Sequence, residues 1–312
     1  MKQTQECPIC RTQLAPIGST ILIKDVFEQW KASHSFSQEV IQEHLDQSAT
    51  TCLYECPNCS LEIYLPQVIG SEGFYRELQE DVQVSYYRDD KWDFDEAVKD
   101  IKNCTAIIEI GCGPGSFLSK AKPHLQRACG TEYNKAALEA ARSKGLEVYG
   151  LEYDIRSLEA TFDAVFSFHV LEHVSDPLDF IKEISLLAKP KGKICISVPD
   201  QTGPMKNIEN SLMNMPPHHA THWKLRTFEV LASKLNLRIT KVAYEPLLLE
   251  NQNYYTYYWL NKAISDKTFF HRKIKKAILI FMRRFFSMLT KKGLKRFPLL
   301  RGQAIYVVME KR

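Results

Sequence analysis

Short apolar runs alternate with amphipathic stretches from residue 106 to the C-terminus. The runs have the length and composition of buried strands, and the stretches between them have the 3.6-residue period of helices with one apolar face. This alternation predicts an α/β domain with a mostly parallel, seven-stranded sheet and helices on both faces. We expect strands near 106–111, 128–132, 146–150, 163–169, 193–198, 238–245 and 303–310, and helices near 116–124, 134–144, 177–188 and 227–236.

The chain of 312 residues is longer than one such domain, so we expect two unequal domains. Its content of 45% hydrophobic and 25% charged residues is that of an ordinary soluble protein. We expect neither a signal peptide nor a membrane span, because the N-terminus is polar and no apolar run reaches about 20 residues. Nine cysteines, four of them in CxxC pairs, favour a reducing compartment, and we expect a cytoplasmic protein.

A glycine-rich turn follows the first expected strand of the domain, in the sequence AIIEIGCGPG from Ala106 to Gly115. Glycines at every second position allow tight, partly positive φ angles and let a ligand approach the main chain. The expected helix behind the turn offers free N–H groups at its N-terminus. Strand, turn and helix in this order predict a nucleotide-type site.

An acidic residue, Glu132, ends the second expected strand. A carboxylate at this place can accept hydrogen bonds from both hydroxyls of a ribose. Dinucleotide-binding folds use the same device, but their G-x-G-x-x-G pattern would put Ser116 in the place of the third glycine. The spacing present is E-x-G-x-G-x-G, from Glu109 to Gly115.

Four motifs together resemble those of the class I S-adenosylmethionine (SAM) dependent methyltransferases. They are E-x-G-x-G-x-G, the acid after the second strand, FDAV at 162–165 and LEHVSDP at 171–177. The chain is similar, over residues 90–245, to the ubiquinone-type and polysaccharide-cluster O-methyltransferases of that superfamily. Each motif is common alone, but all four in this order are specific. The resemblance implies a Rossmann-like sheet and SAM as the cofactor.

The resemblance also implies a role for each motif residue. The glycines pass under the methionine part of SAM, Glu109 orients its amino group and Glu132 holds the ribose. Tyr133 stacks on the adenine, Asp154 contacts its amine, and the last residues of the fourth strand lie beside the sulfonium. The expected cofactor-binding residues are Glu109, Gly111, Cys112, Gly113, Gly115, Glu132, Tyr133, Asp154, Phe168 and His169.

Methyl transfer to an oxygen needs a base or a metal ion to remove the acceptor proton, and histidine titrates in the right range. One candidate group is His169, Glu172 and His173. In the ubiquinone-type relatives the matching loop reads E-x-x-E-H and carries a magnesium ion. His169 stands here in place of the first acid, which argues against magnesium. The alternative is that Glu172 and His173 only brace the loop.

A second candidate group is the segment PPHHATHW at 216–223, after the fifth expected strand. It resembles the acceptor loop of glycan-cluster methyltransferases, and the prolines stiffen it. We expect His218, His219 and His173 to act as the base or as acceptor-binding residues. The alternative for the loop histidines is that they only cap the next helix. The N/D-P-P-[FYW] motif of nucleobase N-methyltransferases is missing after the fourth strand, so an exocyclic base amine is not the expected acceptor.

Two C-P-x-C knuckles, Cys7 with Cys10 and Cys56 with Cys59, predict a structural Cys₄ zinc site in a zinc-ribbon-like module. The helical segment 24–46 lies between them. Four protein ligands leave no position for water, so such a site folds the module and does not catalyse. The alternative is four reduced cysteines in a small core.

A basic insertion lies between the sixth and seventh expected strands. Residues 262–296 carry twelve lysines and arginines against one aspartate, and their apolar residues recur at helical spacing. A basic amphipathic helix can lie on an anionic membrane surface or lipid-linked substrate, or on phosphate-rich acceptors such as RNA. Its apolar face can also pack on the domain or on a second subunit of a homo-oligomer.

We therefore expect a SAM-dependent methyltransferase that modifies an oxygen of a small molecule, sugar or glycan precursor. An RNA methyltransferase and a non-catalytic SAM-binding scaffold are the alternatives, with nucleic acid less favoured because no RNA-binding motif is present. The protein would be cytoplasmic or peripheral at the inner membrane surface. The expected units are 1–65 (zinc-ribbon-like module), 66–100 (connector or lid), 101–246 with 302–312 (methyltransferase domain) and 247–301 (basic helical insertion).

Overall fold

The computed structural model describes residues 5–80, 87–207, 211–249, 252, 256, 260, 269–294 and 296–312. Part of the basic insertion, including Lys262, Asp266, Lys267 and Lys295, lies outside the described residues. Everything below concerns the described residues.

The predicted α/β sheet is confirmed. Seven strands of the described chain pair in the order β11-β12-β9-β8-β5-β6-β7. The pairs from β9 to β7 are parallel, whereas β12 runs antiparallel to both of its neighbours. The bounds are β5 Ala106–Ile110, β6 Arg127–Thr131, β7 Glu147–Tyr149, β8 Phe162–Phe168, β9 Ala188–Pro199, β11 Leu237–Leu248 and β12 Arg296–Lys311.

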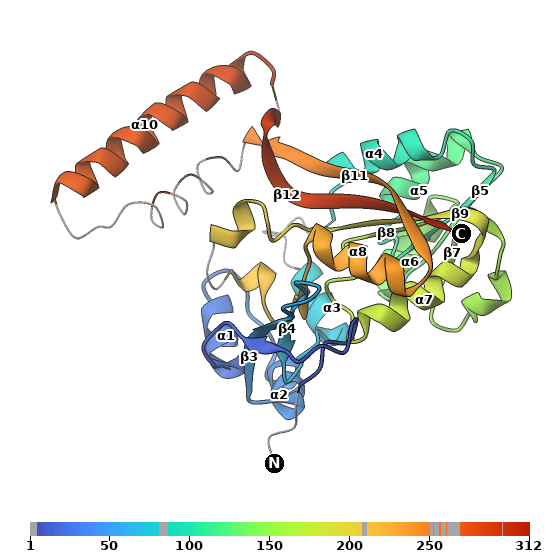
Figure 1. Cartoon of the computed structure of the whole chain (residues 1–312), viewed down its shortest axis with the longest axis horizontal. Helices are drawn as coiled ribbons and strands as arrows, with labels where there is room; N and C mark the ends of the chain where they lie inside the picture. The colour runs from blue at the N-terminus through green and yellow to red at the C-terminus, as the bar shows by residue number, and fades with distance from the viewer. Residues whose placement is uncertain are drawn as a thin grey trace.

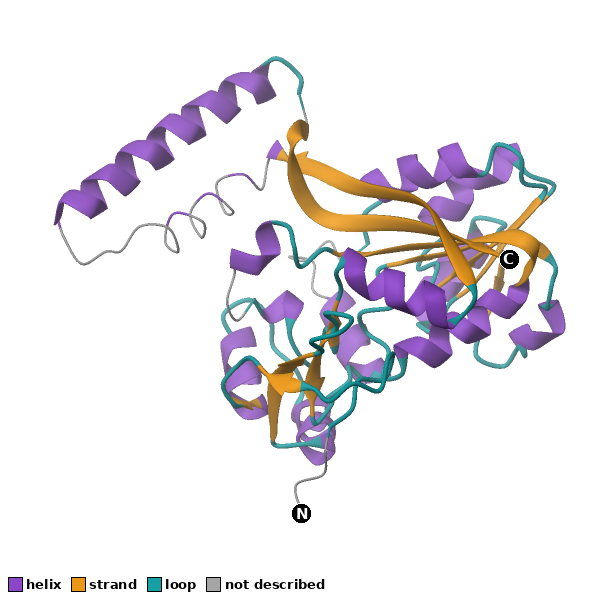
Figure 2. Cartoon of the chain, viewed as in Figure 1, coloured by secondary structure: helices purple, strands orange, loops and turns teal. Residues whose placement is uncertain are grey.

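Helices cover both faces of this sheet (Figure 2). On one face, α4 (Trp92–Asp100), α5 (Ser116–Ala121) and α6 (Lys135–Ser143) share a buried apolar cluster with the strands. On the other face, α7 (Pro177–Leu187) and α8 (Leu225–Lys234) do the same. Short 3₁₀ turns lie at Lys122–His124, Ile155–Leu158, Pro204–Asn207 and Leu212–Asn214.

The starts of the helices follow from local chemistry. The side chain of Asn134 accepts a hydrogen bond from the backbone of Ala137 and so caps α6. Asp176 caps α7, which has Pro177 in its first turn. Helix α8 begins at Leu225, two residues before the predicted start at 227.

The N-terminal module has a small antiparallel sheet and its own apolar core. The sheet contains β1 (Ala15–Pro16), β2 (Ile21–Leu22), β3 (Thr50–Glu55) and β4 (Glu62–Leu65). Helices α1 (Ile23–Trp30) and α2 (Gln38–Gln47) of the module, together with α3 (Glu72–Glu80) of the connector, enclose the core, whose buried side chains include Trp30, Phe27 and Phe74.

A strand from the segment that follows β9 completes this small sheet. Strand β10 (Thr221–His222) pairs antiparallel with β4, and the His222 imidazole lies 2.9 Å from the carboxylate of Glu62. The hydroxyl of Thr227 donates to the carbonyl of Cys59 at 2.9 Å. The module is therefore joined to the segment that follows β9, although about 160 residues separate them in sequence.

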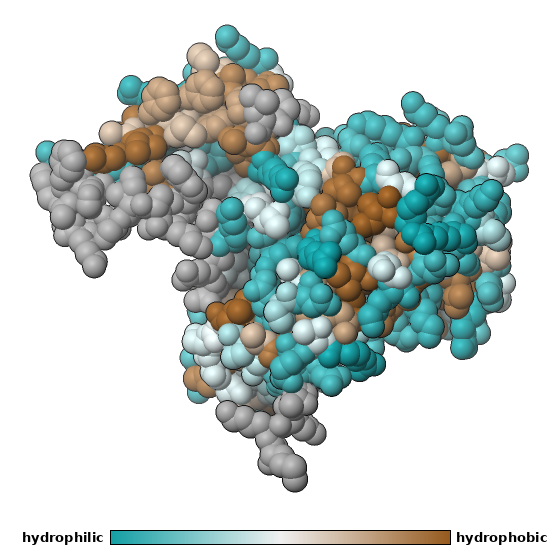
Figure 3. All heavy atoms as spheres, in the orientation of Figure 1, coloured by the Kyte–Doolittle hydropathy of each residue, from teal (hydrophilic) through white to brown (hydrophobic). Residues whose placement is uncertain are grey.

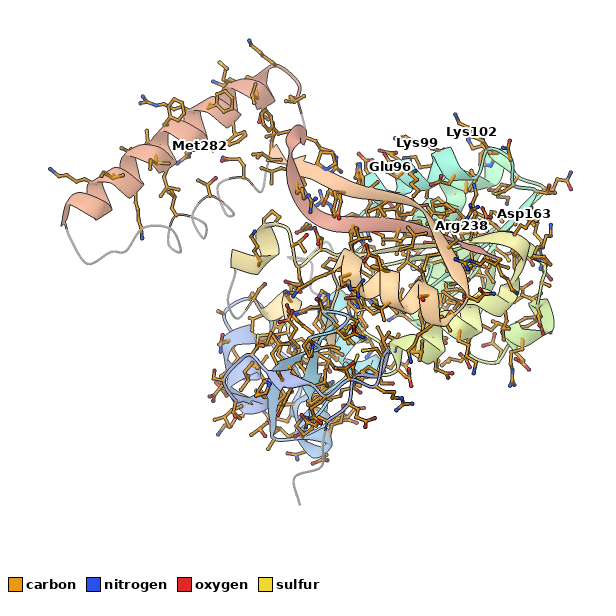
Figure 4. The ribbon with its side chains drawn as sticks, in the orientation of Figure 1. Glu96, Lys99, Lys102, Asp163, Arg238 and Met282 are labelled. Carbon is orange, nitrogen blue, oxygen red and sulfur yellow. The ribbon has the colours of Figure 1, made fainter. Side chains whose placement is uncertain are left out.

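The insertion before the last strand contains α10 (Phe269–Lys291), which extends away from the rest of the molecule (Figure 1). The predicted helical insertion is thus observed, although the β11–β12 ladder reaches further than predicted, to Leu248 opposite Arg296. Apolar side chains lie along the visible face of α10 in Figure 3. Figure 4 labels Met282 on this helix, far from Glu96 on α4. In the described part of the chain, no helix has the length and hydropathy of a membrane span.

Candidate active site

One cavity of about 860 Å³ opens at the carboxyl ends of the parallel strands. The glycine turn after β5 lines it, together with Glu132, Phe168 and the histidines that follow β8 and β9. Residues of the 66–100 connector line the cavity as well. This is the edge at which ligands of open α/β sheets bind.

The glycine turn has the predicted backbone. Gly111, Gly113 and Gly115 have φ angles of +72°, +53° and +78°, which disfavour a side chain. A Cβ on Gly113 would lie 2.6 Å from the ring of Tyr87. The connector therefore packs directly against the turn.

Glu132 is bound to the glycine turn. One carboxylate oxygen accepts from the backbone N–H of Gly113 at 2.7 Å, and the other accepts from Tyr133 and Asn134, each at 2.8 Å. Burial raises the pKa of Glu132, and these backbone bonds oppose that rise. The acid therefore stands where the sequence predicted it and also braces the loop.

Glu109 is buried in the wall of the cavity, and its Oε2 atom makes no hydrogen bond with any described residue. Burial raises its pKa well above the usual range. A buried carboxyl group without a partner indicates a site for a hydrogen-bond donor or a cation.

The two residues predicted to contact adenine differ in position. Tyr133 lines the cavity and is exposed. Asp154 is not among the residues that line the cavity; its carboxylate caps the turn at Ile155 and binds Arg156 at 2.9 Å.

Phe168 and His169 end β8 beside the glycine turn. Phe168 packs edge-on against Phe94 and Phe117. His169 has a φ of +56°, and its Nε2 atom lies 3.0 Å from Oδ2 of Asp93 on α4. Burial lowers the pKa of His169, but the carboxylates of Asp93 and Glu172 outweigh it and raise that pKa to about 9. His169 is therefore an imidazolium ion at neutral pH.

The other three predicted histidines form a cluster. The rings of His173, His218 and His219 have centroids 4.5–4.8 Å apart, and all three line the cavity. Burial lowers the pKa of His173, and burial together with the neighbouring rings holds the pKa of His218 and His219 well below the usual range. All three are neutral at physiological pH.

Two further residues of the site are Tyr75, one of the aromatic residues of the expected connector or lid, and Asp93, which no sequence motif identified. The Tyr75 hydroxyl lies 3.0 Å from Nδ1 of His173 and donates to the carbonyl of His218 at 3.2 Å. Both residues belong to the connector, which carries no catalytic motif. The aromatic content of the connector was the one available signal.

Glu172 lies beneath this cluster. Its carboxylate is almost fully buried, and neither oxygen makes a hydrogen bond with a described residue. Oε1 lies 3.4 Å from Nδ1 of His169 and 4.0 Å from Nε2 of His219. Its backbone carbonyl accepts hydrogen bonds from the backbone N–H groups of Ala220 and Thr221. These bonds hold in place the loop that carries His218 and His219, the histidine loop.

The donor set does not fit the magnesium ion that the sequence resemblance implies. Mg²⁺ requires near-octahedral oxygen ligands, whereas the loop offers one carboxylate, Glu172, among imidazoles, and that carboxylate lies 3.4 Å from His169. His169, at the place of the first acid, is held by Asp93.

The four predicted cysteine ligands meet in the N-terminal module. Their sulfur atoms lie within 4.8 Å of one another, with Cys7 Sγ 3.5 Å from that of Cys59 and Cys10 Sγ 3.3 Å from that of Cys56. Arg11 and Ser60, which follow the two knuckles, have φ angles of +62° and +60°. Both turns thus aim two thiols at one point, and four thiols in this arrangement can hold a tetrahedral ion.

Residues 88–242 match a sequence family described as "Methyltransferase domain". Among curated proteins, the chain is similar to the ubiquinone biosynthesis O-methyltransferases of Vibrio cholerae serotype O1 and Parvibaculum lavamentivorans. The identities are 32% over 99 residues and 33% over 107 residues. These matches cover 29% and 31% of this chain, and about two fifths of each relative's length (40% and 41%).

The solved structures to which the chain is similar include a SAM-dependent methyltransferase from Archaeoglobus fulgidus and one from Mesorhizobium loti. The first has 16% sequence identity and a TM-score of 0.47, and the match covers 76% of this chain and 100% of the other. The second has 14% identity and a TM-score of 0.46, and the match covers 72% and 100%.

Proposed function

We propose that this chain, which carries a class I SAM-dependent methyltransferase domain, transfers the methyl group to an oxygen of a small-molecule, sugar or glycan-precursor acceptor. The observation that carries the proposal is the shared cavity. The glycine turn and Glu132 line it together with the three neutral histidines. Its volume of about 860 Å³ is at the upper end of small-ligand sites, which leaves room for a cofactor and an acceptor.

The cofactor end of the cavity has groups that match SAM. The unpartnered Oε2 of Glu109 suits the amino group, and Glu132, whose Oε2 accepts only one backbone hydrogen bond, suits the ribose hydroxyls. The turn from Gly111 to Gly115 suits the methionine chain, because no Cβ projects from its glycines.

The histidine cluster is the proposed acceptor end. In the transfer, the acceptor oxygen forms a bond to the methyl carbon while the carbon–sulfur bond breaks, and the sulfur keeps the electron pair as S-adenosylhomocysteine. The acceptor also loses a proton, which a neutral imidazole of the cluster can receive. The O-methyltransferase names of the curated relatives support an oxygen acceptor.

Two measurements on the full chain test this proposal. Calorimetry should give binding of SAM and S-adenosylhomocysteine, and an acceptor screen beginning with nucleotide sugars and glycans should give transfer of labelled methyl. SAM binding without turnover on any acceptor would favour the non-catalytic scaffold. Turnover on RNA alone would replace the small acceptor.

For the N-terminal module, we propose a structural Zn²⁺ bound by Cys7, Cys10, Cys56 and Cys59. The support is the approach of the four sulfur atoms and the matching turns at Arg11 and Ser60. The contact between the two thiols lowers the pKa of Cys7 and raises that of Cys59, because the pair shares one proton.

For helix α10, we propose contact with an anionic membrane surface. Ile280, Phe281, Phe285 and Met288 are exposed along it, and the basic side chains of Lys276, Arg283, Arg284 and Lys291 are exposed beside them. An apolar stripe with flanking positive charge is typical of helices that lie in a lipid interface. Phe286 on the opposite side is buried against Phe297, and Phe285 at the edge of the stripe lies near the same ring, with centroids 6.4 Å apart.

A further inference from the structure

The histidine cluster has a feature that a proton acceptor alone does not require. Each of the three rings turns its Nδ1 atom toward an oxygen. His173 faces the carbonyl of His218, His218 faces that of Met213 at 2.9 Å, and His219 faces Oδ1 of Asn214 at 3.1 Å. Carbonyl oxygens only accept hydrogen bonds, so Nδ1 carries the proton in each neutral ring. The lone pair is then on Nε2 of all three.

This arrangement is the one found around metal ions. A metal-binding imidazole almost always donates its other N–H to a carbonyl or carboxylate, which fixes the tautomer and the ring direction. One ring nitrogen from each of His173, His218 and His219 lies within 4.8 Å of the other two. Nitrogens bound to one tetrahedral ion at about 2.1 Å lie roughly 3.4 Å apart. Binding therefore needs only a small approach of the rings.

The charges around the cluster favour a cation. Glu172 is 1% exposed, and neither of its oxygens has a hydrogen-bond partner among the described residues. The neighbouring cation, His169, is already held by Asp93 at 3.0 Å. Glu172 also lies 3.4 Å from His169, so two buried carboxylates share one imidazolium, and a cation bound beside Glu172 would balance the second negative charge.

We infer that His173, His218 and His219 bind a divalent transition-metal ion of the Zn²⁺ class, with Glu172 beside its open position. Imidazole nitrogens suit zinc, cobalt, iron and nickel, whereas Mg²⁺ takes oxygen ligands. This site is separate from the Cys₄ site, with which it shares no residue. Three protein ligands leave one position for a substrate oxygen, which is the pattern of catalytic zinc sites.

The chemical consequence of this site rests on the proposed function. With the three imidazoles bound to the ion, an acceptor hydroxyl in its open position would have a lowered pKa and would give its proton to the carboxylate of Glu172 in place of an imidazole. The alkoxide oxygen would then form its bond to the methyl carbon as the carbon–sulfur bond of SAM breaks. The acceptor class is therefore an alcohol or phenol whose oxygen can reach the ion.

Cobalt is the probe that tests the site without turnover. The full chain, stripped of metal with a chelator under reducing conditions, is titrated with Co²⁺ and followed by absorption. Two equivalents should bind. The Cys₄ site gives thiolate-to-cobalt charge transfer in the near ultraviolet, and the histidine site gives ligand-field bands alone. A titration that ends at one equivalent with charge transfer would overturn the inference while leaving the proposed methyl transfer intact.

Variants locate the second equivalent. The double change His218→Ala with His219→Ala should abolish binding of the second equivalent and keep the first. His124→Ala, which replaces an exposed histidine in the 3₁₀ turn after α5, should keep both. Asn214→Ala removes the oxygen that orients His219 and should weaken the second site by about 10–100-fold. A second equivalent that survives the double change contradicts the inference. Two bound equivalents with no methyl transfer to any acceptor would instead count against the proposed function.

Discussion

Asp93, which is buried, and His169, which is partly exposed, form an ion pair between the connector and the end of strand β8. The Nε2–Oδ2 distance is 3.0 Å, and Asp93 is 2% exposed. The pair links two segments that each line the cavity, and it keeps His169 charged at neutral pH.

Replacement of Asp93 by Asn should change how stability depends on pH. The pKa of His169 is raised to about 9, so its stabilising contribution is complete below about 6.5 and is lost as the pH rises through 9. The free energy of unfolding of the wild type should exceed that of Asp93→Asn by roughly 1–3 kcal/mol at pH 6, and this difference should be smaller at pH 10. Urea unfolding at several pH values measures it. A gap that stays constant from pH 6 to 10 would contradict an ion pair.

Replacement of Glu132 should weaken cofactor binding. Two charge-assisted hydrogen bonds to a ribose are each worth about 1.5–3 kcal/mol, so Glu132→Ala should lower the affinity for S-adenosylhomocysteine by roughly 100-fold or more. Because Glu132 also accepts from Gly113, melting temperatures must be compared alongside the calorimetry. Asp154→Ala is the matched control, since Asp154 binds Arg156 and should leave affinity unchanged. If both variants lost affinity for S-adenosylhomocysteine equally, Glu132 would not be the residue that holds the ribose.

Loss of His218 or His219 should lower turnover more than cofactor binding. Removal of a group that handles the acceptor proton costs about 10²–10⁴-fold in kcat, whereas the glycine turn and Glu132 are untouched. Steady-state kinetics with an identified acceptor, together with calorimetry for SAM, separates the two effects. His124→Ala, with its exposed side chain, serves as the control. If kcat stays within a few-fold in both loop variants, the cluster is structural.

Removal of zinc from the N-terminal module should affect the histidine loop. The backbone of Cys59 accepts from Thr227, and Glu62 of β4 holds His222, so loss of the knuckle loosens residues 221–227. Cys10→Ser should remove one zinc per chain and lower the melting temperature by several degrees, which corresponds to a loss of about 1–2 kcal/mol in the free energy of unfolding. Metal analysis by mass spectrometry with calorimetric melting checks this. Cys52→Ser, outside the Cys₄ set, should retain zinc.

Charge reversal on α10 should abolish membrane binding. Arg283→Glu with Arg284→Glu removes two exposed cations beside the apolar stripe, and each is worth about 1 kcal/mol near an anionic surface. Flotation with vesicles that contain anionic lipid measures it. Lys102→Glu with Lys182→Glu makes the same change of charge on exposed residues elsewhere and should float like the wild type. If the wild type does not float with the vesicles but dimerises through α10, the apolar stripe is a contact surface for a second subunit.

The parts of the fold and site that local chemistry dictates were predicted from the sequence. The glycine turn, the acid at Glu132 and the two cysteine knuckles each lie within a short segment, because backbone conformation and ligand spacing are local constraints. The order of strand and helix was enough to predict the sheet and its ligand-binding edge.

Contacts between distant segments were not predicted. In the sequence, Asp93 is one of several acidic residues at the start of an amphipathic helix, and nothing local distinguishes it. Only the packing of α4 brings it to His169. The burial of His218 and His219 also depends on packing, because Tyr75 and Glu172 from two other segments enclose the loop. For the same reason the sequence did not show that β10 belongs to the first sheet.

The pairing of β10 with β4 also has a consequence for how the chain is made. Strand β4 is complete once residue 65 has left the ribosome, but its neighbour in the sheet arrives only with Thr221 and His222. Through most of synthesis the first-made module therefore presents an open strand edge, the kind of surface that captures foreign strands. Early capture of a metal by the knuckles would hold that module together during this wait, and the late strand would then close its edge and fix the histidine loop in one step.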